Sequence, residues 1–321
     1  MTQKVLITGI TGFAGSFLAE HLLGQSGQYK ISGTYLTETS IANVAHIKKD
    51  LNLISLNLLH KDKVSDLISK IKPDLIFHLA ALSSPSDSFK SPAETITNNV
   101  VAQINLLEAV RAQNLTNSKI LITSSADIYG IVEEKNLPID EETAFMPANP
   151  YAVSKITQDF LAWQYFISYK LNIIRVRPFN HIGPRQAPGF VVSDFAKRIA
   201  YIEKGLTEPI LRVGNLAAKR DFTDVRDMTG AYMLALEKGK AGDVYNIGSG
   251  YAYSIEEILN ILLSMAKLKI TVKKDSLLIR PSDTPKLICN SEKFVKATGW
   301  KPVISLTQTL KDTLDYWRNI V

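Results

Sequence analysis

The chain of 321 residues has only one cysteine, Cys289, so no disulfide can form within it. Disulfides are rare in the reducing cytoplasm, and this composition therefore favours a cytoplasmic protein. We expect the Cys289 thiol to be buried and to have no catalytic role. Long apolar runs are also missing, since none approaches the roughly 20 residues that a membrane-spanning helix requires. Met1 is followed directly by an apolar strand candidate, so we expect neither a membrane anchor nor a leader peptide.

Clusters of basic residues and low-complexity tracts are missing as well. The formal net charge is +6, but Lys and Arg are spread along the chain. Nucleic-acid-binding proteins usually carry a basic stripe, so we expect no nucleic-acid partner. A mildly basic surface can still attract a phosphorylated small molecule. We expect no metal site, and the 45% of apolar residues suffice for one large core with a smaller companion lobe.

Short apolar runs alternate with helical patterns through the first half of the chain. The runs predict strands at residues 4–8, 30–35, 53–58, 74–79, 119–123 and 172–176. They are mostly continuous and not alternating, which is typical of parallel strands covered on both faces. The sequence therefore predicts an α/β Rossmann fold with a doubly wound parallel sheet.

Helix starts are marked by several local patterns. Ser91 followed by Pro92 and Glu94 predicts a capping box with proline at the first helical position. Asn149 and Pro150 open another helix, which we expect to end near residue 171. Two more capping patterns combine a serine with Glu or Gln three positions later, at Ser254 with Glu257 and at Ser305 with Gln308.

The regular alternation stops after Pro178, where glycines and prolines mark a long connection. We expect strands at residues 210–213 and 244–247 and a helix at 227–238, with the strand at 244–247 returning to the main sheet. We predict a dinucleotide-binding domain from residues 1–177 with about 226–249. A smaller α/β substrate lobe is expected from about 178–225 with 250–321.

Three glycines follow the first strand directly in the sequence Gly9-Ile-Thr-Gly12-Phe-Ala-Gly15. Glycine permits a sharp turn and close approach of a pyrophosphate, and the helix N-terminus that follows offers N–H groups to the anion. The alternative, an ordinary glycine-rich turn, does not explain the position between a strand and an amphipathic helix. We predict dinucleotide contacts from Gly9, Thr11, Gly12, Phe13, Ala14 and Gly15.

Tyr151 and Lys155 are four residues apart, so both side chains lie on one face of the helix that begins at Pro150. A free phenol has a pKa of about 10, and a nearby ammonium together with a cationic nicotinamide would favour its phenolate. A Tyr-x-x-x-Lys pair alone is common and could be a surface pair. Here it follows a Rossmann half and a serine-rich strand end, which favours a catalytic role.

These motifs, with the Gly-x-x-Gly-x-x-Gly spacing, resemble the extended short-chain dehydrogenase/reductase family. Further matches are His78-Leu-Ala-Ala81, Asn98-Asn99 and Asn57-Leu58, where the family usually has Asp before Leu or Ile. The resemblance implies that a nicotinamide dinucleotide contacts Asn57, Leu58, Leu79, Ala80, Ala81, Asn98, Thr123, Tyr151, Lys155 and Pro178. The second strand ends at Thr37 without the Asp or Glu typical of NAD or the Arg typical of NADP, so both remain open. Ser40 or Lys48 could reach a 2′-phosphate.

The resemblance also implies the catalytic roles. The serine four residues before Tyr129-Gly130 is Ser125, which would hold the substrate oxygen, while the cofactor delivers hydride and Tyr151 a proton. Asp127 lies where sugar 4,6-dehydratases of the family carry a catalytic Glu. It could be a base, an acceptor for a substrate hydroxyl or an acceptor for turn amides, and the last two together are favoured.

The second lobe carries motifs that the family uses for a nucleotide sugar. The resemblance implies substrate contacts from Ser83, Ser125, Asn180, Phe190, Val191, the basic residue Arg198, Arg220, Arg280 and Asp283. Arginine suits a diphosphate because its planar fork binds two oxygens at once. We expect Arg226, in contrast, to pair with neighbouring carboxylates.

The segment from Arg177 to Asp227 is similar to the GDP-4-keto-6-deoxy-D-mannose reductases, which form GDP-D-rhamnose. GDP-mannose 4,6-dehydratases share part of the pattern, and Pro184-Arg185 is closer to them than to the usual Pro-Gly of the reductases. A nucleotide-sugar 4-epimerase is a third possibility, and a nucleotide-sensing Rossmann protein without catalysis a fourth. Family members commonly dimerise through a four-helix bundle, so we expect the helices at Ser91 and Pro150 to form a homodimer interface.

Overall fold

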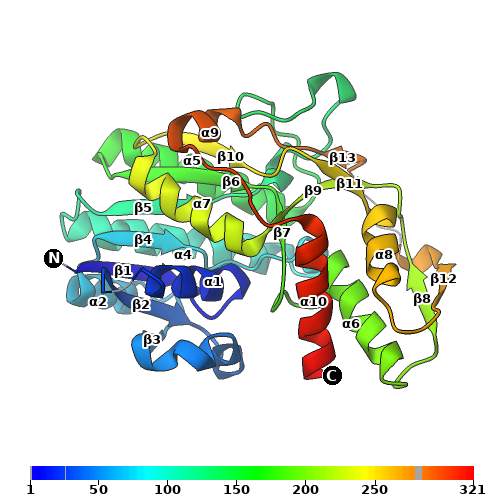
Figure 1. Ribbon diagram of the computed structural model, residues 1–321. Coiled ribbons are helices and arrows are strands. Elements are labelled where there is room, and N and C mark those ends of the chain that lie inside the picture. The colour runs from blue at the N-terminus through cyan, green and yellow to red at the C-terminus, as the bar shows by residue number, and fades with distance from the viewer. Residues whose placement is uncertain (1, 26, 279–283) are drawn as a thin grey trace.

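The computed structural model describes residues 2–25, 27–278 and 284–321, and its centre is a seven-stranded parallel sheet (Figure 1). The strand order is β10-β6-β5-β4-β1-β2-β3. All six pairings are parallel, as the predicted fold class requires. The strands are β1 (Gln3–Thr8), β2 (Tyr29–Tyr35), β3 (Asn52–Ser55), β4 (Leu75–His78), β5 (Lys119–Thr123), β6 (Ile173–Pro178) and β10 (Val244–Ile247).

Helices cover both faces of this sheet, and apolar side chains from its strands enter a core on each face. Leu121 of β5 packs in the core beneath α1 (Phe13–Leu23), α7 (Val225–Lys238) and α9 (Glu292–Thr298). Ile120 and Ile122 face the opposite core, under α2 (Lys61–Ile71), α4 (Pro92–Ala112) and α5 (Pro150–Tyr169). Two short elements follow strands at the same edge of the sheet, η1 (Glu38–Asp50) after β2 and α3 (Pro85–Lys90) after β4.

A second group of elements packs around its own apolar core at the carboxyl end of the sheet (Figure 1). Its helices are α6 (Val191–Glu203), α8 (Ile255–Ser264) and α10 (Leu306–Ile320). A parallel pair joins β8 (Ile210–Val213) to β12 (Thr271–Lys274). The other small sheet contains β7 (Asn180–Ile182), β9 (Lys219–Asp224), β11 (Ala252–Ser254) and β13 (Lys286–Leu287). Short 3-10 helices are also present at η2 (Ala126–Tyr129), η3 (Glu134–Asn136) and η4 (Ser276–Leu278).

Most predicted elements are present, with one error in the capping pattern. The strand at Val244–Ile247 pairs with β6 in the main sheet, as expected. Ser254 and Glu257 form a complete capping box, and Ser305 accepts a hydrogen bond from the amide of Gln308. The helix after Ser91 does begin at Pro92, but the Ser91 side chain makes no capping hydrogen bond, so that capping box is wrong.

The reason for the error lies in the neighbouring helix. Ser91 also ends α3, and its backbone at φ −134° and ψ 64° is not the extended conformation that an N-cap usually adopts.

The third strand ends at Ser55 and not at residue 58, because the chain turns there into Asn57, whose side chain accepts a hydrogen bond from Leu59 N. No helix within the described ranges is both long and apolar enough to cross a membrane.

Candidate active site

The turn between β1 and α1 is built for close approach of a ligand to the backbone. Gly9 has φ +73°, and a Cβ there would lie 3.0 Å from the Cα of Ala80. A Cβ on Gly15 would lie 2.2 Å from the Gly9 carbonyl oxygen, so only glycine fits at either position. Helix α1 begins at Phe13 with Gly12 as its N-cap and no side-chain cap. The first-turn amides and the positive end of the helix dipole therefore suit a pyrophosphate, as the predicted dinucleotide requires.

The segment after β4 is fixed beside this turn by a buried polar contact. Thr8 Oγ1 hydrogen-bonds with His78 Nδ1 at 2.9 Å and accepts from the backbone amide of Ala80 at 3.2 Å. Burial, with a smaller contribution from the positive charge of Lys155, lowers the pKa of His78 to about 3. A neutral His78 therefore joins the ends of β1 and β4 and places Leu79, Ala80 and Ala81 next to the glycine turn.

Helix α4 contributes Asn99, which belongs to the Asn98-Asn99 match but is not among the predicted contact residues. Its side-chain oxygen accepts from Leu82 N at 2.8 Å, and its amide donates to Leu82 O at 3.1 Å and to Ser154 Oγ at 2.9 Å. Asn99 is fully buried and connects the loop that carries Ser83 to the helix that carries Tyr151. The predicted contact residue Asn98 donates to Asn99 Oδ1 at 3.1 Å.

The structure brings together Ser125, Tyr151 and Lys155. Tyr151 hydrogen-bonds to the Ser125 side chain, and Lys155 Nζ lies 5.8 Å from the centroid of the Tyr151 ring. Lys155 Nζ also donates to the Thr123 carbonyl at 2.8 Å, which places it at the end of β5. Helix α5 starts where the sequence predicts, because the Asn149 side chain accepts from Ala152 N at 2.8 Å and Pro150 is the first helical residue.

Burial shifts both ionisable groups of this cluster toward their neutral forms. The pKa of Tyr151 is raised above its usual value, mainly by burial and then by the negative charge of Asp127, while the hydrogen bond with Ser125 opposes this. Burial lowers the pKa of Lys155 to about 7. The sequence predicts that Lys155 and a cationic nicotinamide favour the phenolate. In the chain by itself, burial instead favours the neutral phenol.

Asp127 lies close to Tyr151 within a rigid turn. Its backbone amide donates to Ser125 Oγ at 3.2 Å. The turn ends at Gly130, where φ is +57° and a Cβ would lie 1.6 Å from the Met146 carbonyl oxygen. The Tyr129 hydroxyl is buried between Arg177, which donates to it at 2.9 Å, and Asn246, which accepts from it at 2.7 Å.

The connection after β6 passes over the glycine turn. Pro178 is the last residue of β6, and Asn180 begins β7 two residues later. The His181 ring stacks on the Phe13 ring, with centroids 5.7 Å apart and an interplanar angle of 7°. His181 lies within the segment from Arg177 to Asp227 that resembles the reductases, but no local pattern indicates its contact with Phe13. Phe190 is the N-cap of α6, and Val191 is its first residue.

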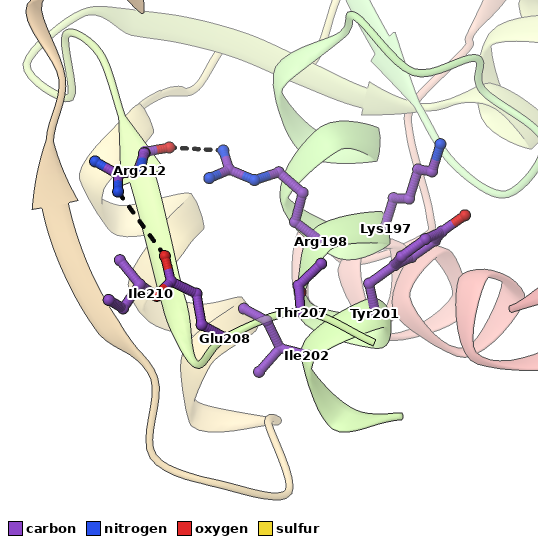
Figure 2. Close-up of a pocket in the computed structure, with 8 residues that line it drawn as sticks. All are labelled: Lys197, Arg198, Tyr201, Ile202, Thr207, Glu208, Ile210 and Arg212. Atoms are coloured by element: carbon purple, nitrogen blue, oxygen red, sulfur yellow. Dashed lines mark hydrogen bonds and ion pairs between the residues drawn. The ribbon is translucent and has the colours of Figure 1, made fainter. Parts of the chain in front are cut away.

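Arg198, another predicted substrate residue, lies on α6 and contacts β8. It is seven positions after Val191 on α6, about 10 Å along the helix axis. Its Nη1 donates to the Arg212 carbonyl of β8 at 2.6 Å, and it lines a cavity of about 310 Å³ between α6 and β8 (Figure 2). In this structure the Arg198 guanidinium therefore contacts the backbone of β8, and its predicted role in substrate binding stays a prediction.

The other charged residues that the sequence singles out in the second lobe differ in their contacts. Arg220 lies on β9 and donates to the Lys219 carbonyl at 2.9 Å. Arg226 pairs with Asp224 and Asp312, both at 2.7 Å, as expected for a structural arginine. Two predicted substrate residues, Arg280 and Asp283, lie outside the described residues.

Asp221 organises the backbone next to Arg220. Its carboxylate accepts from the amides of Ser249, Gly250 and Cys289 at 2.9, 2.8 and 3.1 Å. Burial raises its pKa, and those hydrogen bonds oppose the shift. Cys289 is buried, and burial raises the pKa of its thiol, so the residue is an inert filler as expected.

Comparisons with known proteins agree over the whole chain. Residues 6–313 match the family described as GDP-mannose 4,6 dehydratase. The chain is 34% identical to GDP-6-deoxy-D-mannose reductase of Pseudomonas aeruginosa, covering 100% of this chain and 99% of that protein. It is 30% identical to GDP-mannose 4,6-dehydratase of Vibrio cholerae, covering 97% and 93%.

Solved structures show the same fold. The structure of RMD from Pseudomonas aeruginosa complexed with NADPH has a TM-score of 0.87 at 33% identity and covers 100% of both chains. UDP-glucose 4-epimerase of Thermotoga maritima with UDP-glucose has a TM-score of 0.88 at 25% identity and covers 99% of both chains. With the glycine turn and the Ser-Tyr-Lys cluster in place, these similarities confirm the expected fold class, and the chain belongs to the GDP-mannose 4,6-dehydratase family within the extended short-chain dehydrogenases/reductases.

Proposed function

We propose that this chain reduces the C4 ketone of a GDP-linked 4-keto-6-deoxy-hexose, with GDP-4-keto-6-deoxy-D-mannose as substrate and GDP-D-rhamnose as product. One observation carries the proposal: Ser125, Tyr151 and Lys155 meet at the carboxyl end of β5, where a ketone could contact both hydroxyls. The full-length similarity to GDP-6-deoxy-D-mannose reductase supports the choice of substrate.

Tyr151 is the proposed proton donor. Burial raises its pKa, so the phenol keeps its proton at neutral pH and can give it to the developing alkoxide. Ser125 would hold the ketone oxygen beside the phenol. Lys155, with its pKa lowered to about 7, is partly charged at neutral pH and would stabilise the phenolate that remains.

The cofactor that fits the glycine turn is a reduced nicotinamide dinucleotide, which supplies hydride to the ketone carbon. Its pyrophosphate would lie on the amides of the α1 N-terminus, and Lys155 and Thr123 would lie near its nicotinamide end. We favour NADPH because β2 is followed by Leu36 and Thr37 and not by a ribose-binding carboxylate, and because the similar RMD structure holds NADPH.

The nucleotide sugar would bind between the two groups of elements. We propose the predicted division, with residues 1–177 and about 226–249 for the cofactor and about 178–225 and 250–321 for the substrate. Asn180, at the start of β7, and Phe190, at the start of α6, lie at the chain segments that cross from one group to the other. Arg220 and Arg280 are the proposed diphosphate ligands, with Asp283 near the ribose or base and Ser83, Ser125 and Val191 nearer the hexose.

The direct test is to incubate the purified protein with GDP-4-keto-6-deoxy-D-mannose and NADPH and to identify the product by NMR. Tyr151→Phe is expected to lower kcat by about 10²- to 10⁴-fold, since it removes the proton donor. Tyr165→Phe is the matched control, because Tyr165 lies on the same helix and its hydroxyl donates to Glu108 at 2.7 Å. Undiminished turnover by Tyr151→Phe would refute the assigned role.

A 4,6-dehydratase is the second candidate. Asp127 lies near enough to raise the pKa of Tyr151, so an acidic group is present where a dehydratase would need a base. Incubation with GDP-mannose and oxidised cofactor separates the two candidates. Formation of a 4-keto-6-deoxy product from GDP-mannose would replace the reductase assignment.

We also propose a cytoplasmic homodimer. The lone cysteine favours a reducing compartment. The dimer is proposed from the exposed apolar side chains on α5, which include Phe160 at 53% and Ile167 at 46% exposure. No nucleic-acid or membrane partner forms part of this proposal.

A further inference from the structure

Arg185, in the connection between β7 and α6, holds this connection against α1. Its Nη1 and Nη2 donate to the two carboxylate oxygens of Glu20 at 2.7 and 2.9 Å. Its Cζ lies 3.7 Å from the centroid of the Phe17 ring, and only 15% of its side chain is exposed. A bidentate ion pair combined with stacking on an aromatic ring is a geometry that arginine can make and lysine cannot.

The same guanidinium reaches the segment that follows β2. Arg185 Nη1 also donates to the Asn43 carbonyl of η1 at 3.0 Å. The Asn43 side chain in turn donates to the Thr11 carbonyl at 2.9 Å. Thr11 Oγ1 hydrogen-bonds with Ser40 Oγ at 2.7 Å. A continuous chain of hydrogen bonds therefore runs from the β7–α6 connection to the glycine turn and to the start of η1.

The backbone of Arg185 is held in an unfavourable conformation. Its φ is +69°, the left-handed region, which costs a residue with a Cβ about 1 kcal/mol. Such strain persists only where surrounding contacts determine the conformation, and here the contacts are made by the guanidinium. A glycine at this position would relax the backbone and remove every one of those contacts.

We propose that Arg185 is a positioning residue for the cofactor. Arg185 lies in the connection to the substrate-binding elements and fixes the position of Thr11 and η1 through Asn43. In a Rossmann fold, the segments after the first and second strands border the adenosine ribose of the cofactor. The inference rests on the proposed use of NADPH and adds a role for a residue that touches neither nicotinamide nor sugar. Its consequence is that the connection carrying Asn180 and Phe190 and the adenosine end of the cofactor site are energetically coupled.

Three variants distinguish the effect of the Arg185 side-chain contacts from the effect of its backbone conformation. Arg185→Gln removes the bidentate pair, Arg185→Gly removes it while relaxing the backbone, and Arg185→Lys keeps a charge without the fork. The matched control is Arg318→Gln. Arg318 makes a similar bidentate pair with Glu203 at 2.8 and 2.7 Å, with 18% of its side chain exposed, but it joins α10 to the end of α6.

The readout is the dissociation constant of NADPH, measured by fluorescence titration of the purified protein, together with the melting temperature. We expect Arg185→Gln and Arg185→Gly to weaken NADPH binding about tenfold and Arg185→Lys to restore part of the loss. Arg318→Gln should lower the melting temperature about as much as Arg185→Gln while leaving NADPH affinity within about twofold of wild type. In turnover, KM for NADPH should rise while kcat stays nearly constant.

NADPH affinities of Arg185→Gln and Arg185→Gly within twofold of wild type would overturn the inference. So would an equal loss of affinity in Arg318→Gln, since the effect would then be general destabilisation. The titration needs no turnover, so it stays decisive if the wild type binds NADPH but does not reduce the keto sugar. In that case the proposed function fails and the inference about Arg185 stands.

Discussion

Lys155 is buried, and its burial affects the stability of the fold independently of any reaction. Its pKa falls from 10.5 to about 7 because burial disfavours the ammonium. Between these values the unfolded chain binds more protons than the folded one, so the free energy of unfolding rises with pH through this window. Below pH 7 both states carry the proton and the dependence from this group disappears.

We expect the wild type to gain about 2 kcal/mol in unfolding free energy relative to Lys155→Met between pH 7 and pH 9. The measurement is urea unfolding of both proteins across this range, below the pH at which tyrosines ionise. Lys119→Met controls for loss of a lysine, because Lys119 Nζ also donates to a backbone carbonyl, that of Leu236, at 2.8 Å. Parallel pH curves for wild type and Lys155→Met would contradict the buried, neutralised lysine.

Among the secondary-structure elements, α5 and β6 are joined by a charge cluster that sequence patterns did not indicate. Asp159 of α5 has no exposed surface and accepts from Arg175 Nη1 at 2.7 Å and from Arg177 Nε at 2.8 Å. Arg177 also reaches the Tyr129 hydroxyl, so the cluster extends to the turn after Ser125. The helix that carries Tyr151 is thereby fixed against the strand that ends at Pro178.

Asp159→Asn is expected to lower the free energy of unfolding by about 3 to 5 kcal/mol, because two buried guanidinium groups lose their counter-charge. Asp315→Asn is the control, since its carboxylate is 39% exposed in the pairs with Lys311 and Arg318, and exposed pairs contribute less than about 1 kcal/mol. Chemical denaturation measures both. A loss of less than 1 kcal/mol in Asp159→Asn would mean that other contacts fix α5 on β6.

The sequence predicts the central sheet well because strands such as β1, β4 and β5 are continuous apolar runs that are buried on both faces. The strands at Lys119–Thr123, Ile210–Val213 and Val244–Ile247 have the predicted bounds. Strand β12 was not predicted, because all four of its residues, Thr271–Lys274, are exposed and carry no apolar pattern. Segment η1 was not predicted, although Ile41, Val44 and Ile47 are spaced three residues apart, as the 3-10 helix there requires.

In the candidate site, too, the sequence predicts local features but not contacts between distant residues. Tyr151 and Lys155 are one helical turn apart, so their shared face follows from the sequence. Arg185 and Glu20 are 165 residues apart, and no local pattern pairs them. The contacts of Asn99 with Leu82 and Ser154 span 17 and 55 residues and are also not marked by a local pattern; the contact with Ser154 depends on the packing of α4 on α5.

At the scale of the whole molecule, α5 presents an apolar face that the single chain leaves exposed. Val153, Phe160, Trp163 and Ile167 are 41, 53, 39 and 46% exposed and are spaced as one face of the helix. Contiguous exposed apolar surface of this kind marks an interaction site more often than a solvated face. Because α5 packs beside α4, a second copy meeting this face would form the four-helix bundle predicted from the sequence.

We therefore expect light scattering to give twice the chain mass of 35.6 kDa for the wild type. The double variant Phe160→Glu with Ile167→Glu should give a monomer, because two carboxylates cannot be buried unpaired in an apolar interface. Leu206→Glu is the control, since Leu206 is 61% exposed but lies after the C-terminal end of α6. A monomeric wild type, or a double variant that remains dimeric, would show that α5 does not form the interface. Helix α5 also carries Tyr151 and Lys155, so NADPH affinity reports whether the substitutions disturb the helix. If each subunit folds independently of the contact, the monomeric variant should keep its NADPH affinity.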